Sequence, residues 1–363
     1  MRFGRKSLSA VPVRLVLVLM TACLASSAFA MHPGMAKNIA LGGGMVGVVQ
    51  GSFGNKPGDH AEAVGRGDLV LSFRVGEATI AVMDLEATGG DGPDAGIPNF
   101  SLLNGVAGGS GDRLRFREAW VEHSAFSDRL IVTIGKVDLT NYFDINTVAN
   151  DGNSQFLAGA FVNSAVLGAP GIGPGMRVHG KLTESLTLGL GYGSGDADSA
   201  DILDHGFAVG ELDCRLKPGG LEGNYRVYGT LDGAAPDGVK KLSAKHAFGY
   251  GFSVDQQVSE NLTLFGRFGR RDEDAYAAKS AWSAGFLYVG PIPRRGDDSI
   301  GFGYGQVLAE SASAQERLLE AYYKAKISDR IAISPHLQYL INPLGNKDAD
   351  NVLVTGLRTL IIF

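Results

Sequence analysis

The chain has 363 residues, and its 33 lysines and arginines are outnumbered by 38 aspartates and glutamates, for a net charge of −5. This acidic balance argues against a nucleic-acid-binding protein, which would need a basic surface. The length alone is compatible with two or three domains. However, 52 glycines are spread along the chain, and no linker or low-complexity boundary divides it. We therefore expect one large β structure.

The first thirty residues have the pattern of a secretory signal peptide. A basic start is followed by an apolar run over 15–24 and by Ala-Phe-Ala at 28–30. We expect cleavage after this tripeptide, which makes 1–30 the signal peptide and 31–363 a single mature domain. A retained membrane anchor fits less well, because it would need about 20 apolar residues. A lipoprotein signal at Cys23 is disfavoured by the atypical Met-Thr-Ala that precedes it.

The mature chain is more acidic than the precursor. Residues 1–30 carry four basic side chains and no acidic one, so their removal leaves 29 basic (33 − 4) against 38 acidic residues and a net charge of −9. Cys214 is the one remaining cysteine, which excludes an intramolecular disulfide and a thiolate metal site. No apolar run after the signal approaches about 18 residues, so we expect no membrane helix.

Segments with alternating apolar and polar character recur along the whole mature chain. The alternation predicts sixteen strands, at 42–53, 67–75, 78–87, 113–125, 129–136, 173–182, 185–193, 206–216, 223–230, 245–257, 261–269, 281–290, 299–306, 316–327, 330–340 and 352–363. An even number of antiparallel strands is typical of a bacterial outer-membrane barrel. The sequence therefore predicts an all-β transmembrane antiparallel β-barrel.

The connections between these strands are predicted to alternate strictly between short and long. The seven short ones are 76–77, 127–128, 183–184, 217–221, 259–260, 291–298 and 328–329. The eight others run from about nine to about thirty-seven residues. Outer-membrane barrels have short periplasmic turns and long outer loops. Sixteen strands with both chain ends in the periplasm need seven short turns and eight long loops, which matches the pattern.

The two faces of the predicted strands also differ. In the segment before Ile327, Glu320 and Lys324 lie on one side, and Leu319 and Ala325 lie on the other. Soluble antiparallel sheets alternate as well. Sixteen such segments in an exported chain without disulfides are more specific, because only a closed sheet pairs every backbone group within lipid.

The last residue, Phe363, is in step with one face of the final predicted strand. A terminal aromatic residue on an alternating strand resembles the signal that the outer-membrane assembly machinery reads. We therefore expect that machinery and outer-membrane lipid to be partners of the chain.

Two stretches resemble the carbohydrate-selective porins of the OprB family. One is Gly135-Lys-Val-Asp-Leu-Thr-Asn-Tyr-Phe-Asp-Ile-Asn-Thr-Val-Ala-Asn-Asp, continuing to Gln155-Phe156-Leu157, and the other runs from Glu320-Ala-Tyr-Tyr-Lys through Ile333-Ser-Pro-His-Leu-Gln-Tyr-Leu-Ile-Asn-Pro to Gly356-Leu-Arg-Thr. Residues 175–315 match by architecture only. The resemblance implies a sixteen-stranded homotrimeric porin of a Gram-negative outer membrane that passes sugars by passive diffusion.

The segment 137–173 is the longest predicted connection, and its composition is unlike that of a linker. Aromatic residues alternate in it with short carboxylates and amides, which favours packing over disorder. A sixteen-stranded barrel is wide enough for an aqueous channel, so we expect this segment to fold into the lumen as a constriction loop. The candidate constriction and solute-binding residues are Asp138, Asn141, Asp144, Asn146, Asn150, Asp151, Gln155 and Phe156.

Opposite this loop we expect a ladder of inward basic side chains. The candidates by strand parity are Arg74, Arg115, Arg117, Arg177, Lys181, Arg226, Arg267, Lys324 and Arg358. We expect about half of these side chains only to balance lumen acids such as Glu211, Asp213 and Glu320.

Other chemistry is weakly indicated. The aspartates at 196, 198, 201 and 204 could hold a hard cation such as Ca²⁺ through oxygen ligands, although such a run is more often a solvated loop tip. The histidines lack metal-ligand spacing, and no Gly-x-Ser-x-Gly nucleophile motif occurs. We therefore expect no cofactor and no enzymatic activity.

The sequence thus predicts a pore that filters solutes by diameter, hydrogen bonding and fixed charge. The main hypothesis is passive diffusion of carbohydrates and small hydrophilic solutes. A general or ion-selective porin without sugar preference is the alternative. A barrel enzyme or adhesin is a third class, and an enzyme would be distinguished by loss of activity on a single Ser or His change.

Overall fold

The computed structural model describes residues 38–54, 60–106, 113–194, 206–233, 247–273, 275–310 and 312–363. The expected signal peptide 1–30 and the aspartates between 196 and 204 lie outside these ranges. Within them, no helix is both long and apolar enough to cross a membrane.

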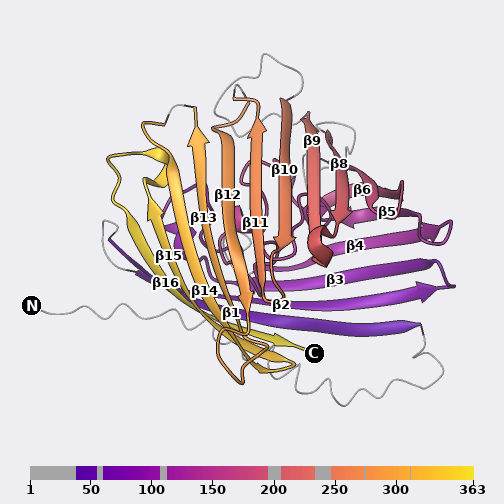
Figure 1. The fold of residues 1–363 in the computed structure, drawn as a ribbon, viewed down its shortest axis with the longest axis horizontal. Coiled ribbons are helices and arrows are strands. Elements are labelled where there is room, and N and C mark those ends of the chain that lie inside the picture. The colour runs from indigo at the N-terminus through magenta and orange to yellow at the C-terminus, as the bar shows by residue number, and fades with distance from the viewer. Residues whose placement is uncertain are drawn as a thin grey trace, which may run out of the picture.

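Sixteen strands form the wall of a closed barrel, and neighbours in the chain are neighbours in the sheet. They are β1 (Ile39–Phe53), β2 (His60–Val75), β3 (Thr79–Gly89), β4 (Arg113–Ala125), β5 (Leu130–Val137), β6 (Gly173–Lys181), β7 (Leu186–Ser194), β8 (Gly206–Leu216), β9 (Gly223–Asp232), β10 (Ala247–Gln257), β11 (Leu262–Arg271), β12 (Ala278–Val289), β13 (Ser299–Ala309), β14 (Glu316–Ser328), β15 (Ile331–Ile341) and β16 (Val352–Ile362). Figure 1 shows them wrapping in order from indigo β1 to yellow β16.

The barrel closes where the first strand meets the last. β1 pairs antiparallel with β16, for example Val48 with Arg358. Beyond the end of β16, Phe363 still pairs with Gly43, because their backbone N–H and C=O groups exchange hydrogen bonds of 3.0 and 3.1 Å. Every described strand therefore has two neighbours, and none of them leaves an open sheet edge. The predicted fold class, an all-β antiparallel barrel of sixteen strands, is confirmed.

The observed strand ends lie within three residues of the predicted ones except at the start of β2. This strand begins at His60 instead of residue 67, and Ala61 to Arg66 pair with β1. The backbone ladder continues there although the side chains no longer form an apolar stripe. The predicted strict alternation of connection lengths is consequently wrong: the connections 54–59 and 310–315 are shorter than the turn 290–298.

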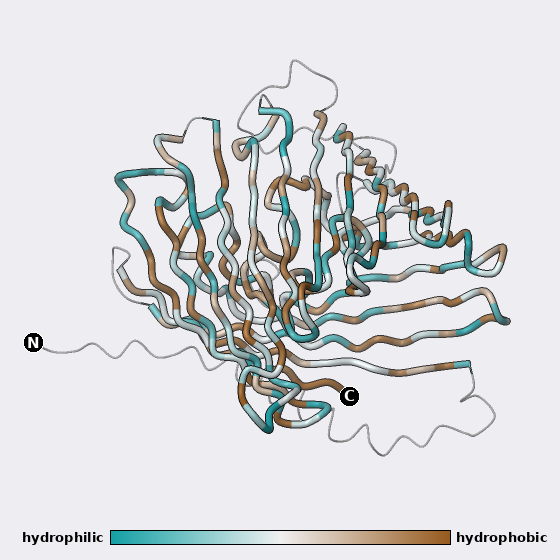
Figure 2. Tube along the Cα trace, in the orientation of Figure 1, coloured by the Kyte–Doolittle hydropathy of each residue, from teal (hydrophilic) through white to brown (hydrophobic). Residues whose placement is uncertain are grey.

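The two faces of the wall have opposite polarity. On β10, Phe248, Tyr250 and Phe252 point outward and are about half exposed, whereas Ser253 and Asp255 point inward and are buried. Hydrophilic and hydrophobic residues accordingly alternate along the strands (Figure 2). An apolar exterior with a polar interior is the pattern of a barrel that faces lipid.

Candidate pore constriction

The segment between β5 and β6, residues 138–172, crosses the interior of the barrel. It contains a short 3₁₀ helix, η3 (Leu139–Asn141), and one α-helical turn, α2 (Gly159–Val162). Its backbone reaches the far wall, where Leu157 N donates to Glu320 on β14 (2.7 Å). The Arg358 guanidinium on β16 donates to the carbonyls of Gly152 (2.9 Å) and Gln155 (2.8 Å). We call residues 138–172 the long inner loop.

Three aromatic side chains anchor the long inner loop to the wall. We call the face of the loop that packs against the wall its underside. Phe143, Phe156 and Phe161 are at most 2% exposed. The ring centroids of Phe156 and Phe161 lie 5.0 Å apart, within a cluster that includes wall residues of β11, β14 and β15. Burial of each such side chain contributes about 1.5–3 kcal/mol. Together they contribute about 5–9 kcal/mol toward the entropy cost of ordering the loop.

Glycines in the wall make room for these rings. A Cβ on Gly303 of β13 would lie 3.1 Å from both Phe156 and Phe161, and a Cβ on Gly191 of β7 would lie 2.6 Å from Phe143. Both glycines take inward positions of strands whose outward residues are larger. The wall therefore lacks inward side chains at the positions against which the loop aromatics pack.

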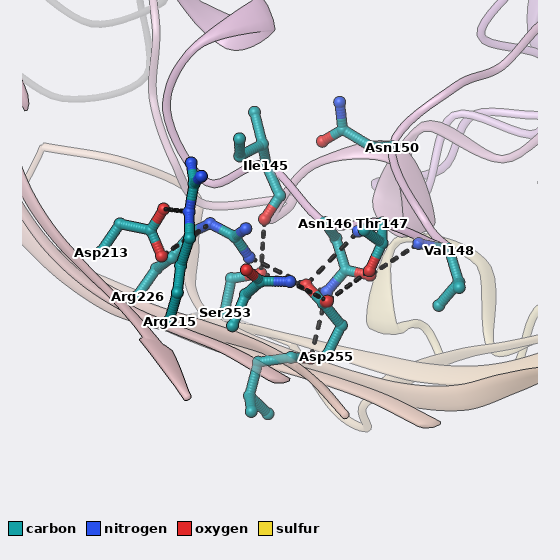
Figure 3. Close-up of polar contacts among 12 residues, drawn as sticks. Ile145, Asn146, Thr147, Val148, Asn150, Asp213, Arg215, Arg226, Ser253 and Asp255 are labelled. Atoms are coloured by element: carbon teal, nitrogen blue, oxygen red, sulfur yellow. Dashed lines mark hydrogen bonds and ion pairs between the residues drawn. The ribbon is translucent and has the colours of Figure 1, made fainter. Parts of the chain in front are cut away.

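Asp255 on β10 is a second anchor (Figure 3). Its carboxylate accepts hydrogen bonds from the backbone N–H and the hydroxyl of Thr147, and it forms an ion pair of 2.9 Å with Arg226. Beside it, Ser253 donates to the Ile145 carbonyl (3.0 Å), and Asn146 Nδ2 donates to the Val254 carbonyl (3.1 Å). Wall side chains thus satisfy the backbone of this part of the loop.

Asp144 is held by charge as well as by burial. Arg267 on β11 donates to the carbonyls of Phe161 (2.7 Å) and Asp144 (2.8 Å), and its Nε lies 3.3 Å from Asp144 Oδ2. Glu211 on β8 accepts from Asp144 N (2.7 Å). Burial raises the pKa of the Asp144 carboxyl, and the Arg267 guanidinium opposes that rise. This aspartate therefore fixes the loop to the wall and is not exposed to solvent.

Glu320 on β14 completes the set of anchors. One carboxylate oxygen accepts from Leu157 N and lies 2.9 Å from His336 Nδ1. The other accepts from Ala158 N (2.9 Å) and Gln338 Nε2 (3.1 Å). The carboxylate is fully buried, with both oxygens satisfied.

A second connection also folds inward, and the sequence reasoning missed it. Residues 90–106, between β3 and β4, bury Ile97, Leu103 and Val106. Glu316 on β14 accepts hydrogen bonds from Phe100 N (2.9 Å) and from Ser101 Oγ (2.6 Å). We call this segment the short inner loop. The apolar residues spaced through a Gly-rich connection were the available signal, because the same feature identified the long inner loop.

The two inner loops are joined to each other by backbone hydrogen bonds. Gly105 N donates to Leu157 O (2.8 Å), and Gly159 N donates to Leu102 O (2.7 Å). Leu102 has a positive φ of 52°, which is uncommon outside glycine. Its side chain is about half exposed beside this junction. The loops therefore form one plate across the barrel.

Between this plate and the wall formed by β2 and β4 lies a cavity of about 470 Å³. Charged side chains line one side of it: Arg66 on β2, Arg117 on β4 and Asp138 at the start of the long inner loop. Polar loop residues add Asn141, Asn150, Asp151, Asn153 and Asn163, and the apolar lining is Phe100, Leu102, Ala160, Val162 and Ala165. The cavity therefore combines a charged side, amide groups and an apolar side.

A bulge in β4 turns two successive side chains inward beside this cavity. Asp84 of β3 pairs with Glu118 and Leu85 pairs with Phe116, which leaves Arg117 as the extra residue. Arg117 reaches Asp138 (3.0 Å), and Glu118 accepts from Asn141 Nδ2 (2.9 Å). A β-bulge re-aims a side chain in this way, so a strict two-residue period could not place both residues inside.

Half of the predicted constriction residues line the cavity, namely Asp138, Asn141, Asn150 and Asp151. Asp144, Asn146 and Phe156 are buried on the underside instead. The Gln155 side chain accepts from the backbone N–H groups of Asn150 (2.7 Å) and Asp151 (3.0 Å), so it shapes the loop.

The predicted basic ladder divides into several groups. Arg117 lines the cavity, and Arg115 pairs with Glu86 (2.8 Å) beside it. Arg226, Arg267 and Arg358 are buried under the plate. Arg226 and Arg267 form ion pairs with Asp255 and Asp144, the role expected for about half of the ladder, and Arg358 donates to loop carbonyls. The remaining candidates are Arg177 over the Tyr142 ring (3.9 Å), the exposed Arg74 and Lys181 near the short turns, and the half-buried Lys324.

Arg66 lines the cavity but is absent from the predicted ladder. It sits in the part of β2 that the sequence reasoning assigned to a connection. Its alternation with Asp68, the partner of its Nε at 3.0 Å, was the available signal.

A closed barrel with a polar interior, an apolar exterior and inner loops that narrow the lumen defines an outer-membrane channel of the porin class. Residues 67–363 match the family model described as the carbohydrate-selective porin, OprB family. The chain belongs to this family, as its two signature stretches predicted.

Curated relatives are only distantly similar. The chain is 28% identical over 227 residues to an uncharacterised protein of Aquifex aeolicus, and the match covers 62% of each chain. It is 26% identical over 174 residues to Porin B of Pseudomonas aeruginosa, and that match covers 38% of each chain. The chain thus spans less than two thirds of the length of these relatives.

Among solved structures, the high-pH structure of Pseudomonas putida OprB has a TM-score of 0.79 with this chain at 20% identity, covering 90% of this chain and 94% of that one. The outer-membrane channel DcaP of Acinetobacter baumannii has a TM-score of 0.56 at 13% identity, covering 90% and 97%. These likenesses establish the fold. The family and the fold are those of channels and imply the outer membrane as the location.

Proposed function

We propose that the mature chain passes carbohydrates and small hydrophilic solutes through the cavity by passive diffusion. The observation that supports this most is the composition of the cavity lining. A sugar ring has C–H faces and a rim of hydroxyls, and Phe100 and Leu102 offer apolar surface to the former. The amides and charged groups on the other sides can exchange hydrogen bonds with the hydroxyls.

Asn153 illustrates the polar side. Its Oδ1 is buried and has no hydrogen-bond partner among the described residues. The residue lines the cavity, so a small rotation of its side chain would offer the unsatisfied acceptor to a solute hydroxyl. In this proposal the long inner loop is the constriction, because its anchors hold it across the lumen while its amides face the solute path.

We also propose how the pore reaches the membrane and assembles there. The chain is exported through a signal peptide that is cleaved after Ala30, contacts outer-membrane lipid and assembles as a homotrimer, as expected for this class of protein. We further propose that Phe363 contributes to recognition by the assembly machinery, since this aromatic residue pairs with Gly43 of β1 where the barrel closes.

Liposome swelling with the purified mature chain tests the function. Neutral hexoses should enter faster than non-sugar polar solutes of the same size. Asn153→Ala and Leu102→Ser should each lower that preference. Asn261→Ala, in the exposed turn between β10 and β11, is the control and should leave the preference unchanged. Equal rates for sugars and size-matched solutes would instead favour a general porin, for which the charged residues of the cavity are the supporting observation.

A further inference from the structure

We propose that the cavity selects solutes by charge: it admits neutral sugars and protonated amino sugars and disfavours anionic sugars such as uronates and sugar phosphates. This inference rests on the proposed function and specifies its substrate class. It also reverses the emphasis of the predicted basic ladder, because acids outnumber bases in the group formed by the charged cavity residues and their ion-pair partners.

The first reason is the balance of charged groups around the cavity. The cavity-lining charged residues and their ion-pair partners comprise three arginines, Arg66, Arg115 and Arg117, and six acids, Asp68, Asp84, Glu86, Glu118, Asp138 and Asp151. In this group of described residues the acids therefore outnumber the bases by two to one.

The second reason is that carboxylates already surround the two lining arginines. Arg66 Nε lies 3.0 Å from Asp68 and 3.3 Å from Glu86. Arg117 lies 3.0 Å from Asp138 and 3.5 Å from Glu86, with two further acids within 4 Å. An incoming anion would have to compete with these carboxylates for each guanidinium. The arginines hold the acids in place more than they offer a free positive site.

The third reason is Asp151, on the loop side of the cavity. Its carboxylate accepts from Asn153 N (2.8 Å) and Ser154 Oγ (2.6 Å). No basic side chain in the described ranges forms an ion pair with it. The acid therefore presents a carboxylate that no direct ion pair neutralises to a solute that passes between the plate and the wall.

Most arginines elsewhere in the lumen are engaged by partners of their own. Arg226 and Arg267 are buried in ion pairs with Asp255 and Asp144, and Arg358 is buried against loop carbonyls. Lys324 on β14 and Arg358 both interact electrostatically with Asp151, but neither side chain lines the cavity or forms an ion pair with this acid. In a narrow passage the field of nearby fixed charges is screened less than at an open surface.

Two measurements on the mature protein in planar bilayers and liposomes test the inference. The reversal potential in a KCl gradient should show severalfold preference for K⁺ over Cl⁻. In swelling assays, glucose and glucosamine should enter severalfold faster than glucuronate, which differs little from them in size.

Asp151→Asn is the informative variant, because asparagine keeps an acceptor oxygen for the loop hydrogen bonds. It should lower the K⁺ preference and raise glucuronate entry relative to glucose. Asp329→Asn, in an exposed short turn, is the matched control and should leave both ratios unchanged.

Absence of cation preference, or anion preference, in the wild-type pore would overturn the inference. So would glucuronate entry as fast as glucose, or an Asp151→Asn pore with unchanged ratios. The proposed function fails separately, if ions pass but neutral hexoses show no preference over size-matched solutes. In that case the reversal potential still tests whether the cavity selects solutes by charge.

Discussion

The two sides of the long inner loop use the same kinds of residue for opposite purposes. Asp144 and Asp151 are seven positions apart, yet the first is fully buried against Arg267 and the second lines the cavity. Asn146 and Asn153 divide in the same way: Asn146 donates a hydrogen bond to the wall, whereas Asn153 lines the cavity and its Oδ1 has no partner among the described residues. The type of side chain therefore does not decide whether a residue fixes the loop to the wall or lines the cavity.

The difference lies in which part of the wall each side faces. The underside meets β8, β10, β11 and β13–β16, where inward glycines and buried charges fit the loop closely. The cavity side faces β2 and β4, from which the plate stands away. Changes on the underside should act through docking of the loop, and changes on the cavity side should act through the solute.

Shortening the long inner loop should have the largest effect on transport. Shortening residues 143–160, with β5 and β6 intact, should raise single-channel conductance and admit larger oligosaccharides, because the plate loses most of its area. Shortening the exposed connection 346–350 between β15 and β16 serves as the control. A folded variant with unchanged conductance and size limit would place the loop outside the solute path.

Phe161→Ala should weaken the underside strongly. A large-to-small change in a packed cluster costs about 3–5 kcal/mol, and Phe161 is fully buried. The expected result is a lower stability in denaturant titrations and faster proteolysis within the loop. Phe252→Ala, on the lipid face, should cost less. Equal losses for the two variants would contradict the packing assigned to Phe161.

Glu320→Gln should have a smaller effect of the same kind. The substitution replaces one acceptor oxygen by an NH₂ group and leaves a buried loop N–H, of Leu157 or Ala158, without a partner. Such a group costs about 1–3 kcal/mol. Proteolysis of the loop and channel noise in bilayers should both increase. The exposed Glu184→Gln is the control, and a loop equally protected in both variants would argue against this anchor.

The smallest expected effect is that of Asp144→Asn on ion preference. Asp144 is buried and paired with Arg267, so neutralising it should leave the reversal potential of correctly docked pores unchanged. Asp151→Asn makes the same chemical change and should shift that potential. A shift of similar size in both variants would show that the two sides of the loop are not electrically distinct.

Much of this molecule follows from local sequence pattern. The two-residue alternation located the strands, because each strand separates lipid from the polar lumen independently of its distant neighbours. The signature around Val137 identified the family. The aromatic content of 138–172 indicated that this connection packs inward, since Phe143, Phe156 and Phe161 need apolar partners.

Only the tertiary structure decided which polar residues reach the cavity. Asp144 is buried because Glu211 and Arg267, far away in the chain, meet it there. Arg117 and Glu118 both point inward because a bulge breaks the period of β4. The short inner loop is held by Glu316, more than 200 residues further on. Alternation fixes a residue's face on its own strand, but contacts across the barrel decide whether that face meets water or another part of the chain.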